Sequence, residues 1–252
     1  MRQLKKQLYG SVNRDCTERR ERPPPLSIAH LLAWTALAAV LMCWMTWLAK
    51  LQGLAPGPTQ LAWRVIIPMT GGANLGGLLL LVWRIRRIPF PVAPGEWLWF
   101  TQGACMLLSV AAGSVFIPLI MNPRSATYVL AAYYGMTYLS ATLIFLLPAV
   151  RCNHGGPWKF LFWTASVLEA LSAVLFAWMI IATPTGLSPR SWSVANLARQ
   201  TILAAALIWA LASDRRQGAK RPWTHWVGAM IMAVNLAMQF SSSAWTLYNI
   251  SA

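Results

Sequence analysis

The chain has 252 residues, of which 57% are hydrophobic and only 11% are charged, yet its formal net charge is +15. The basic residues are spread over four separate segments instead of lining one face, which excludes nucleic acid as the partner. Four cysteines without a CxxC motif exclude a disulfide framework.

The first segment, residues 1–27, is polar, basic and proline-ended. It has no apolar run of the kind that forms the core of a cleavable signal peptide. Pro23, Pro24 and Pro25 prevent a helix from continuing out of it. We predict a basic cytoplasmic tail over 1–27, either a disordered topology signal or a basic helix on the membrane surface, and a transmembrane domain over 28–252.

Seven later segments have the length and composition of membrane spans. The hydrocarbon core of a bilayer is about 30 Å thick and needs roughly 20 apolar residues in a helix. We predict an all-α, polytopic integral membrane protein with seven transmembrane helices, over residues 28–49, 61–83, 97–121, 128–150, 159–182, 194–213 and 226–248.

The lysines and arginines alternate between the two sides of these spans. Of the 21, 16 lie in the tail and in the loops after the second, fourth and sixth spans, whereas only Lys50, Arg124 and Arg190 lie on the other side. The positive-inside rule then predicts a multi-pass protein of the cytoplasmic (inner) membrane, with the N-terminus inside and the C-terminus outside. The basic segments are expected to contact anionic headgroups, so membrane lipids are the expected partners.

The first three spans resemble the last three. Residues 38–45 and 172–179 are identical at five of eight positions, and each segment is followed by a Gly-Leu-x-Pro loop. Arg64 in the second span and Arg199 in the sixth then follow at similar depth. Two triplets joined by one helix predict a 3+1+3 parallel repeat, although apolar composition can produce such matches by convergence.

Glu169 lies near the middle of the fifth span, where a carboxylate must be protonated, paired or hydrated. Arg199 lies at similar depth in the sixth span, and sequential antiparallel helices are neighbours. An ion pair between them is therefore geometrically plausible. Such a pair either fixes the helix register or belongs to a substrate-coupled or proton-coupled site, and a lone protonated glutamate is the remaining alternative.

Arg64 lies closer to the rim of its span than Arg199 does. It either extends to the interface or, as the pseudo-symmetric partner of Arg199, faces one central cavity. Two arginines facing one cavity would favour an anionic substrate.

Three spans carry polar side chains on one helical face. In the seventh span these are Asn235, Gln239, Ser242 and Ser243; in the fourth, Tyr134, Thr137 and Tyr138; and in the third, Gln102, Cys105 and Ser109. Such faces must meet protein or water instead of lipid. They either form hydrogen bonds between helices or line a cavity.

The second span contains Pro68 and four glycines between residues 71 and 77, around Asn74. Small residues permit close helix packing. Alternatively, the span is a discontinuous helix whose backbone binds a ligand near Asn74.

We find no catalytic constellation, and His30, His154 and His225 lack metal-ligand spacing, so neither enzyme activity nor a metal site is predicted. The seventh span has no lysine for a retinal Schiff base, and no cofactor is predicted. The predicted function is small-molecule, possibly anion, transport along a path lined by Glu169, Arg199, Arg64, Asn74, Asn235 and Gln239. The alternative is a non-transporting sensor, assembly factor or scaffold that acts through a partner.

Overall fold

The computed structural model describes residues 28–51, 58–85, 93–120, 126–151, 156–182 and 189–251. The predicted tail, 1–27, lies outside this part of the chain. Within it, all regular structure is helical, and each predicted span coincides with one helix to within little more than a turn. The seven described helices are α2 (Ile28–Leu51), α3 (Pro58–Ile85), α4 (Pro94–Ile120), α5 (Ala126–Arg151), α6 (Gly156–Ala182), α7 (Pro189–Arg216) and α8 (Trp223–Ser251).

The helices α4 to α8 are each long and apolar enough to cross a bilayer. In α2 and α3, the apolar segments among the described residues are shorter and comprise Leu31–Trp47 and Val65–Leu79. The chain is therefore an all-helical, multi-pass membrane protein, with five membrane-length helices among its described residues. That α2 and α3 also cross the membrane, which would give seven crossings in all, remains a prediction.

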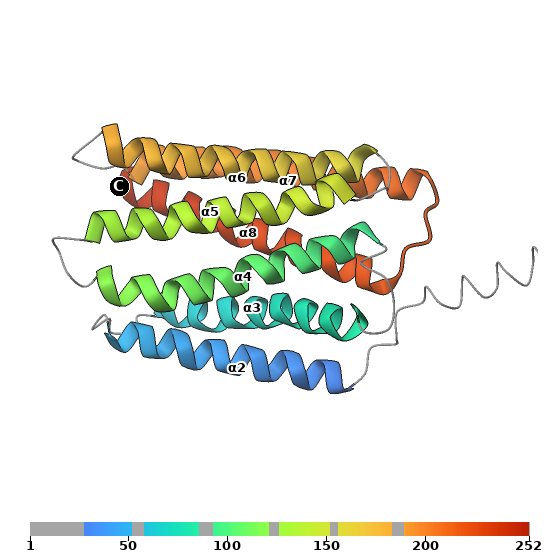
Figure 1. Ribbon diagram of the computed structural model, residues 1–252, viewed down its shortest axis with the longest axis horizontal. Coiled ribbons are helices and arrows are strands. Elements are labelled where there is room, and N and C mark those ends of the chain that lie inside the picture. Colours follow the sequence, from blue (N-terminus) through green and yellow to red (C-terminus); the bar gives the residue numbers. More distant parts are fainter. Residues whose placement is uncertain are drawn as a thin grey trace, which may run out of the picture.

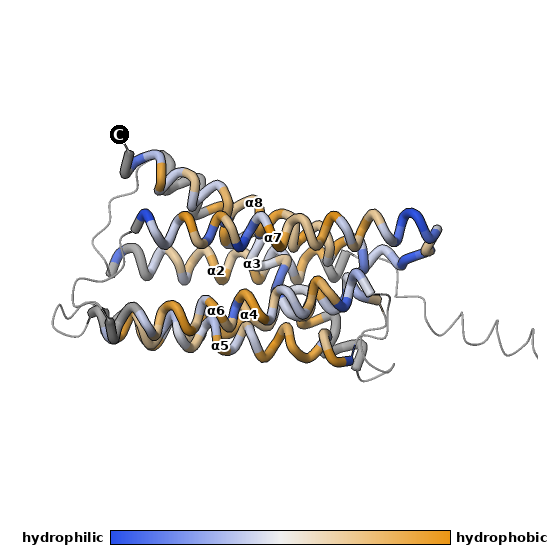
Figure 2. Tube along the Cα trace, turned by 90° about the horizontal axis from the view of Figure 1, so that it is seen from above, coloured by the Kyte–Doolittle hydropathy of each residue, from blue (hydrophilic) through white to orange (hydrophobic). Residues whose placement is uncertain are grey.

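Consecutive helices run side by side in alternating directions (Figure 1). One end of the bundle holds the first residues of α4, α6 and α8 and the turn from α7 to α8, which is hydrophilic (Figure 2). We call this the basic end, because its described cations are Arg151, Lys159, Arg215, Arg216, Lys220 and Arg221. The other end, where the described cations are Lys50 and Arg190, is called the opposite end.

Five helices form a closed ring. Each of α4, α5, α6 and α7 packs against the next helix along the chain, and α8 packs back against α4. The α2–α3 hairpin lies outside this ring, where α3 contacts α4 and α8. The members of the ring are the same five helices that reach membrane length.

The apolar core fills the half of the ring nearest the basic end. Its most buried large side chains are Leu98, Trp158, Leu161 and Phe162, contributed by α4 and α6. Phe145 of α5, Leu207 of α7 and Met232 of α8 complete the core. The half of the ring toward the opposite end is lined differently, as described below.

Glycines allow the closest helix contacts. The Gly95 carbonyl oxygen of α4 occupies the place that a Cβ atom of Gly228 in α8 would take, so the two backbones touch. In α3, Cβ atoms added at Gly72 and Gly77 would meet Ala38 and Trp99. Since α3 is continuous through Pro68, the glycine run serves helix packing, and the alternative of a discontinuous helix is wrong.

Candidate functional site

A polar cavity of about 390 Å³ lies inside the ring and is lined by residues from all five of its helices. Its lining extends from Phe145 and Met232, at the edge of the apolar core, to Trp192 of α7 and Ser243 of α8, nearer the opposite end. The apolar core therefore closes the cavity toward the basic end.

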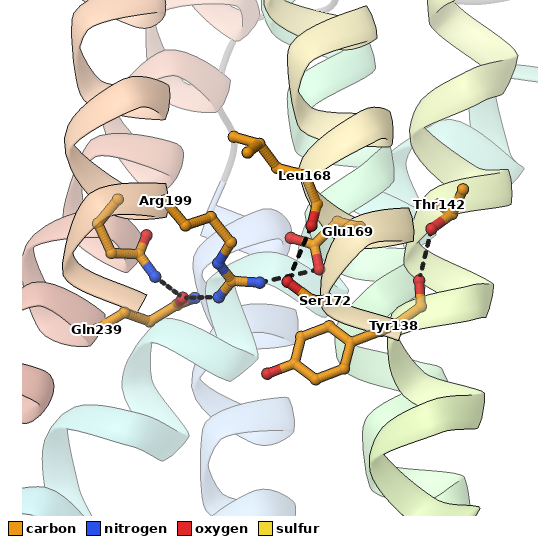
Figure 3. Close-up of polar contacts among 8 residues, drawn as sticks. Tyr138, Thr142, Leu168, Glu169, Ser172, Arg199 and Gln239 are labelled. Carbon is orange, nitrogen blue, oxygen red and sulfur yellow. Dashed lines mark hydrogen bonds and ion pairs between the residues drawn. The ribbon is translucent and has the colours of Figure 1, made fainter. Parts of the chain in front are cut away.

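The only described charged side chains that line the polar cavity belong to Glu169 and Arg199. Arg199 Nη1 donates a hydrogen bond of 3.0 Å to Glu169 Oε2, across the interface of α6 and α7 (Figure 3). The side chain of Arg199 is only 10% exposed and that of Glu169 only 12%. The structure thus confirms the ion pair, and the pairing leaves the cavity without net charge.

Arg199 has further partners around the pair. Its Nη2 donates to Gln239 Oε1 at 3.0 Å, and its guanidinium lies 5.5 Å from the ring centre of Tyr138. The same Gln239 oxygen accepts a hydrogen bond of 2.5 Å from Gln200 Nε2. Four helices, α5 to α8, therefore converge on one guanidinium (Figure 3).

Two polar atoms at this site have no partner within the described part of the chain. They are Arg199 Nε, a donor, and Gln200 Oε1, an acceptor, and both are buried. Each buried polar group left without a hydrogen bond costs about 1–3 kcal/mol.

A second hydrogen-bonded group joins the cavity to α3. Asn235 Nδ2 of α8 donates to Gln102 Oε1 of α4 at 2.9 Å and lies 3.5 Å from Asn74 Oδ1 of α3. Asn235 and Gln102 line the cavity, whereas Asn74 does not and is buried behind them. This contact also connects the α2–α3 hairpin to the ring.

Aromatic rings form the side of the cavity toward the opposite end. The rings of Tyr133, Tyr134, Tyr138 and Trp192 line it. Phe176 packs behind them, with its ring centre 4.8 Å from that of Tyr134 and 4.5 Å from that of Trp192. Aromatic rings give a cavity a large apolar contact surface while keeping polar tips for hydrogen bonds.

A separate polar cluster lies at the basic end, where α8 begins. Asp214 accepts two hydrogen bonds from Arg221, of 2.7 and 3.0 Å, and lies 3.3 Å from His225 Nε2. Thr224 donates a hydrogen bond of 2.6 Å to Glu96. Glu96 is buried and lies in the first turn of α4, at the basic end.

The structure brings together most of the predicted path. Glu169, Arg199, Asn235 and Gln239 line the polar cavity, and Asn74 lies one contact behind it. Arg64 belongs to α3, but its side chain lies outside the described part of the chain. The polar faces of the third, fourth and seventh spans also line the cavity, through the ten residues predicted from their spacing.

Four cavity residues with a hydrogen-bonding side chain were missed from the sequence: Tyr133, Trp192, Asn196 and Gln200. Gln200 follows Arg199 directly in an apolar helix, and this second buried polar group was a usable signal. Trp192 and Asn196 lie near the start of α7, where polar residues are ordinary, so their sequence carries no signal.

The described residues contain no group of three or more His, Cys, Asp and Glu side chains able to hold a metal ion. Cys105 lines the polar cavity and Cys43 is exposed, whereas Cys16 and Cys152 lie outside the described residues. His154 and the side chain of His30 also lie outside them.

No protein-family model, curated protein or solved structure significantly matches this chain. Its function is therefore argued from the geometry of the polar cavity.

Proposed function

We propose that this protein is a small-molecule transporter of the cytoplasmic membrane, with the polar cavity as its substrate site. One observation supports this proposal above the others: a polar cavity of about 390 Å³, with a buried ion pair, lies inside a ring of membrane-length helices. Ionisable residues within a membrane are costly and are typical of substrate and ion pathways.

The proposed topology places the cavity toward the outside. The positive-inside rule puts the basic end in the cytoplasm, with α2 and α3 as two further crossings. In the proposed 3+1+3 repeat, α2, α3 and α4 correspond to α6, α7 and α8.

The ion pair suggests how substrate binding is coupled to a proton. While Glu169 is ionised, it neutralises Arg199, and an anion gains little from entering the cavity. A proton placed on the Glu169 carboxylate would remove that competition and free the guanidinium for an anionic group on the substrate. An anion and a proton would then enter together, with Arg64 as a second proposed source of attraction.

The second candidate function is a sensor, assembly factor or scaffold that works through a partner. It is favoured by the small exposure of Glu169 and Arg199 and by the cations that gather at the basic end. In this case the ion pair would only fix the register of α6 and α7.

Cysteine accessibility distinguishes the two functions. Single cysteines would be placed at Asn235, Glu169 and Asn74 in a chain without Cys16, Cys43, Cys105 and Cys152, and treated with a membrane-impermeant thiol reagent. A transporter predicts that position 235 reacts from the outside and position 74, behind the cavity wall, reacts far more slowly. Val174→Cys, which is 65% exposed on the lipid face of α6, is the unreactive control.

A scaffold predicts that none of these positions reacts from either side. Uptake of radiolabelled organic anions into proteoliposomes, with and without an inward proton gradient, then tests transport itself. Anion uptake by the unaltered chain that does not depend on the proton gradient would contradict the proposed coupling. Unchanged uptake by the Glu169→Gln and Arg199→Gln variants would contradict it as well.

A further inference from the structure

A second space, of about 570 Å³, lies between α7 and α8 on the outside of the ring. Its lining is mostly apolar and includes Ala205, Ile208, Ala237 and Phe240, all of which are exposed on the surface that faces lipid. We call it the apolar groove. Along α7 it extends from Gln200 to Ile208, which corresponds to about 12 Å of helix.

Gln200 and Leu236 border both the apolar groove and the polar cavity. Only one layer of side chains therefore separates the two spaces. Gln200 is 1% exposed, and its hydrogen bond to Gln239 crosses from α7 to α8 within this layer. The Gln200 oxygen that lacks a partner lies in the same layer.

We propose that the site binds an amphiphile, with its polar head in the polar cavity and its single apolar chain in the apolar groove. The chain would pass between α7 and α8 beside Gln200. This inference rests on the proposed function, because it names the substrate class of the same cavity. The head would form hydrogen bonds with polar side chains that line the cavity, such as Asn196 and Gln239.

Other occupants of the groove explain less. A helix of a second copy would cover the apolar residues but would leave the polar cavity beside the groove empty. A wholly polar substrate would use the cavity and leave the groove to bulk lipid. A single amphiphile would occupy both spaces and contact the two residues that border them, Gln200 and Leu236.

Photolabelling tests the inference on the full chain in phospholipid vesicles. The first probe is an alkyl glucoside whose sugar carries a carboxylate, the anionic group that the proposed transport requires, and whose chain carries a diazirine. Its hydroxyl groups both accept and donate hydrogen bonds. The second is the diazirine alkane of equal length, without a head. We expect the glucoside to label residues 200–208 and 233–241 saturably, and excess unlabelled glucoside to compete, whereas the alkane labels them without saturation.

Variants of the cavity and of the groove test separately how the polar head and the apolar chain of the amphiphile bind. Ala205→Trp fills the groove, and Gln239→Leu and Asn196→Leu change the cavity wall; each is expected to lower saturable labelling about tenfold, the loss that corresponds to about 1.4 kcal/mol. Ala132→Trp is the matched control, since Ala132 is also exposed but lies on α5, away from both spaces. It should leave labelling unchanged.

Equal, unsaturable labelling by both probes would overturn the inference and make the groove an ordinary lipid surface. Labelling that falls as the protein density in the vesicle rises would also overturn it, in favour of a second copy. If saturable labelling is found but no variant alters uptake, the transport proposal fails while the amphiphile site stands. If uptake depends on Glu169 and Arg199 but labelling is not saturable, the amphiphile site fails while the transport proposal stands.

Discussion

The backbone N–H of Gly95, at the start of α4, donates a hydrogen bond of 2.9 Å to Nδ1 of His225, near the start of α8. Since Nδ1 accepts, the imidazole proton is on Nε2, which faces Asp214 of α7 at 3.3 Å. His225 is fully buried and its ring meets Trp158 of α6 edge-on, with 4.9 Å between ring centres. One imidazole therefore links four helices of the ring at the basic end.

Replacing this imidazole should destabilise the protein. His225→Ala leaves the Gly95 N–H unpaired in the interior and opens a void, and a buried unpaired group costs about 1–3 kcal/mol. We expect a clearly lower unfolding temperature in detergent. Trp226→Ala is the adjacent control, because Trp226 is 48% exposed, and it should change the unfolding temperature far less. Equal unfolding temperatures for the two variants would refute this role of His225.

The contact between Gly95 and Gly228 should not tolerate a side chain. A Cβ atom at position 228 would overlap the Gly95 carbonyl group, and backbone atoms can move aside only with the whole helix. We expect Gly228→Ala to destabilise the fold by about 1–3 kcal/mol, as overpacking does. Size-exclusion profiles after graded heating measure this loss.

Gly135 of α5 provides the control for that experiment. Among the described residues, no atom beyond its own turn of helix lies within 4 Å of the place where its Cβ would be. Because alanine is favoured over glycine inside a helix by about 0.5–1 kcal/mol, Gly135→Ala should be neutral or stabilising. A heating profile that falls equally for both alanine variants would contradict the close contact of α4 and α8.

The ion pair between Glu169 and Arg199 should behave as a unit. Arg199→Leu leaves an uncompensated buried carboxylate, and breaking a buried pair in this way costs about 3–5 kcal/mol. The double change Glu169→Leu with Arg199→Leu should recover much of that loss, which a double-mutant cycle of thermal unfolding measures. If the double variant folds but does not transport, the pair serves function more than stability.

The face of the Tyr138 ring is expected to contribute to uptake by supporting the Arg199 guanidinium. Its ring supports the Arg199 guanidinium at 5.5 Å, and such contacts contribute about 0.5–2 kcal/mol. Tyr138→Leu removes the ring and should raise the KM for uptake several-fold, whereas Tyr138→Phe keeps the ring and should have little effect. Similar KM values for the two variants would show that the ring face is not used.

Local sequence information was sufficient for the helices and for part of the site. Apolar runs located all seven of the described helices, because the membrane allows few other structures. Glu169 and Arg199 were paired correctly because they lie on consecutive antiparallel helices. The spacing of Asn235 and Gln239 also placed both on one face, and that face does line the polar cavity.

The contacts between α4 and α8 could not be predicted in this way. Glu96 and His225 lie 129 positions apart and near helix ends, where polar residues are usually exposed, so their positions in the sequence do not indicate burial. Their burial depends on the crossing at Gly95 and Gly228, which no periodicity reveals. Likewise, the partnership of Asn235 with Gln102 requires knowing that α8 packs against α4.

The closure of the ring by α4 and α8 has a consequence for biosynthesis. The ribosome delivers α4 early, but the space beside it stays open to lipid until α8 emerges, more than a hundred residues later. During that interval, Gln102 and Arg199 lack their partners on α8. A nascent chain arrested after α7 should therefore remain exposed to membrane chaperones and quality-control proteases until translation resumes.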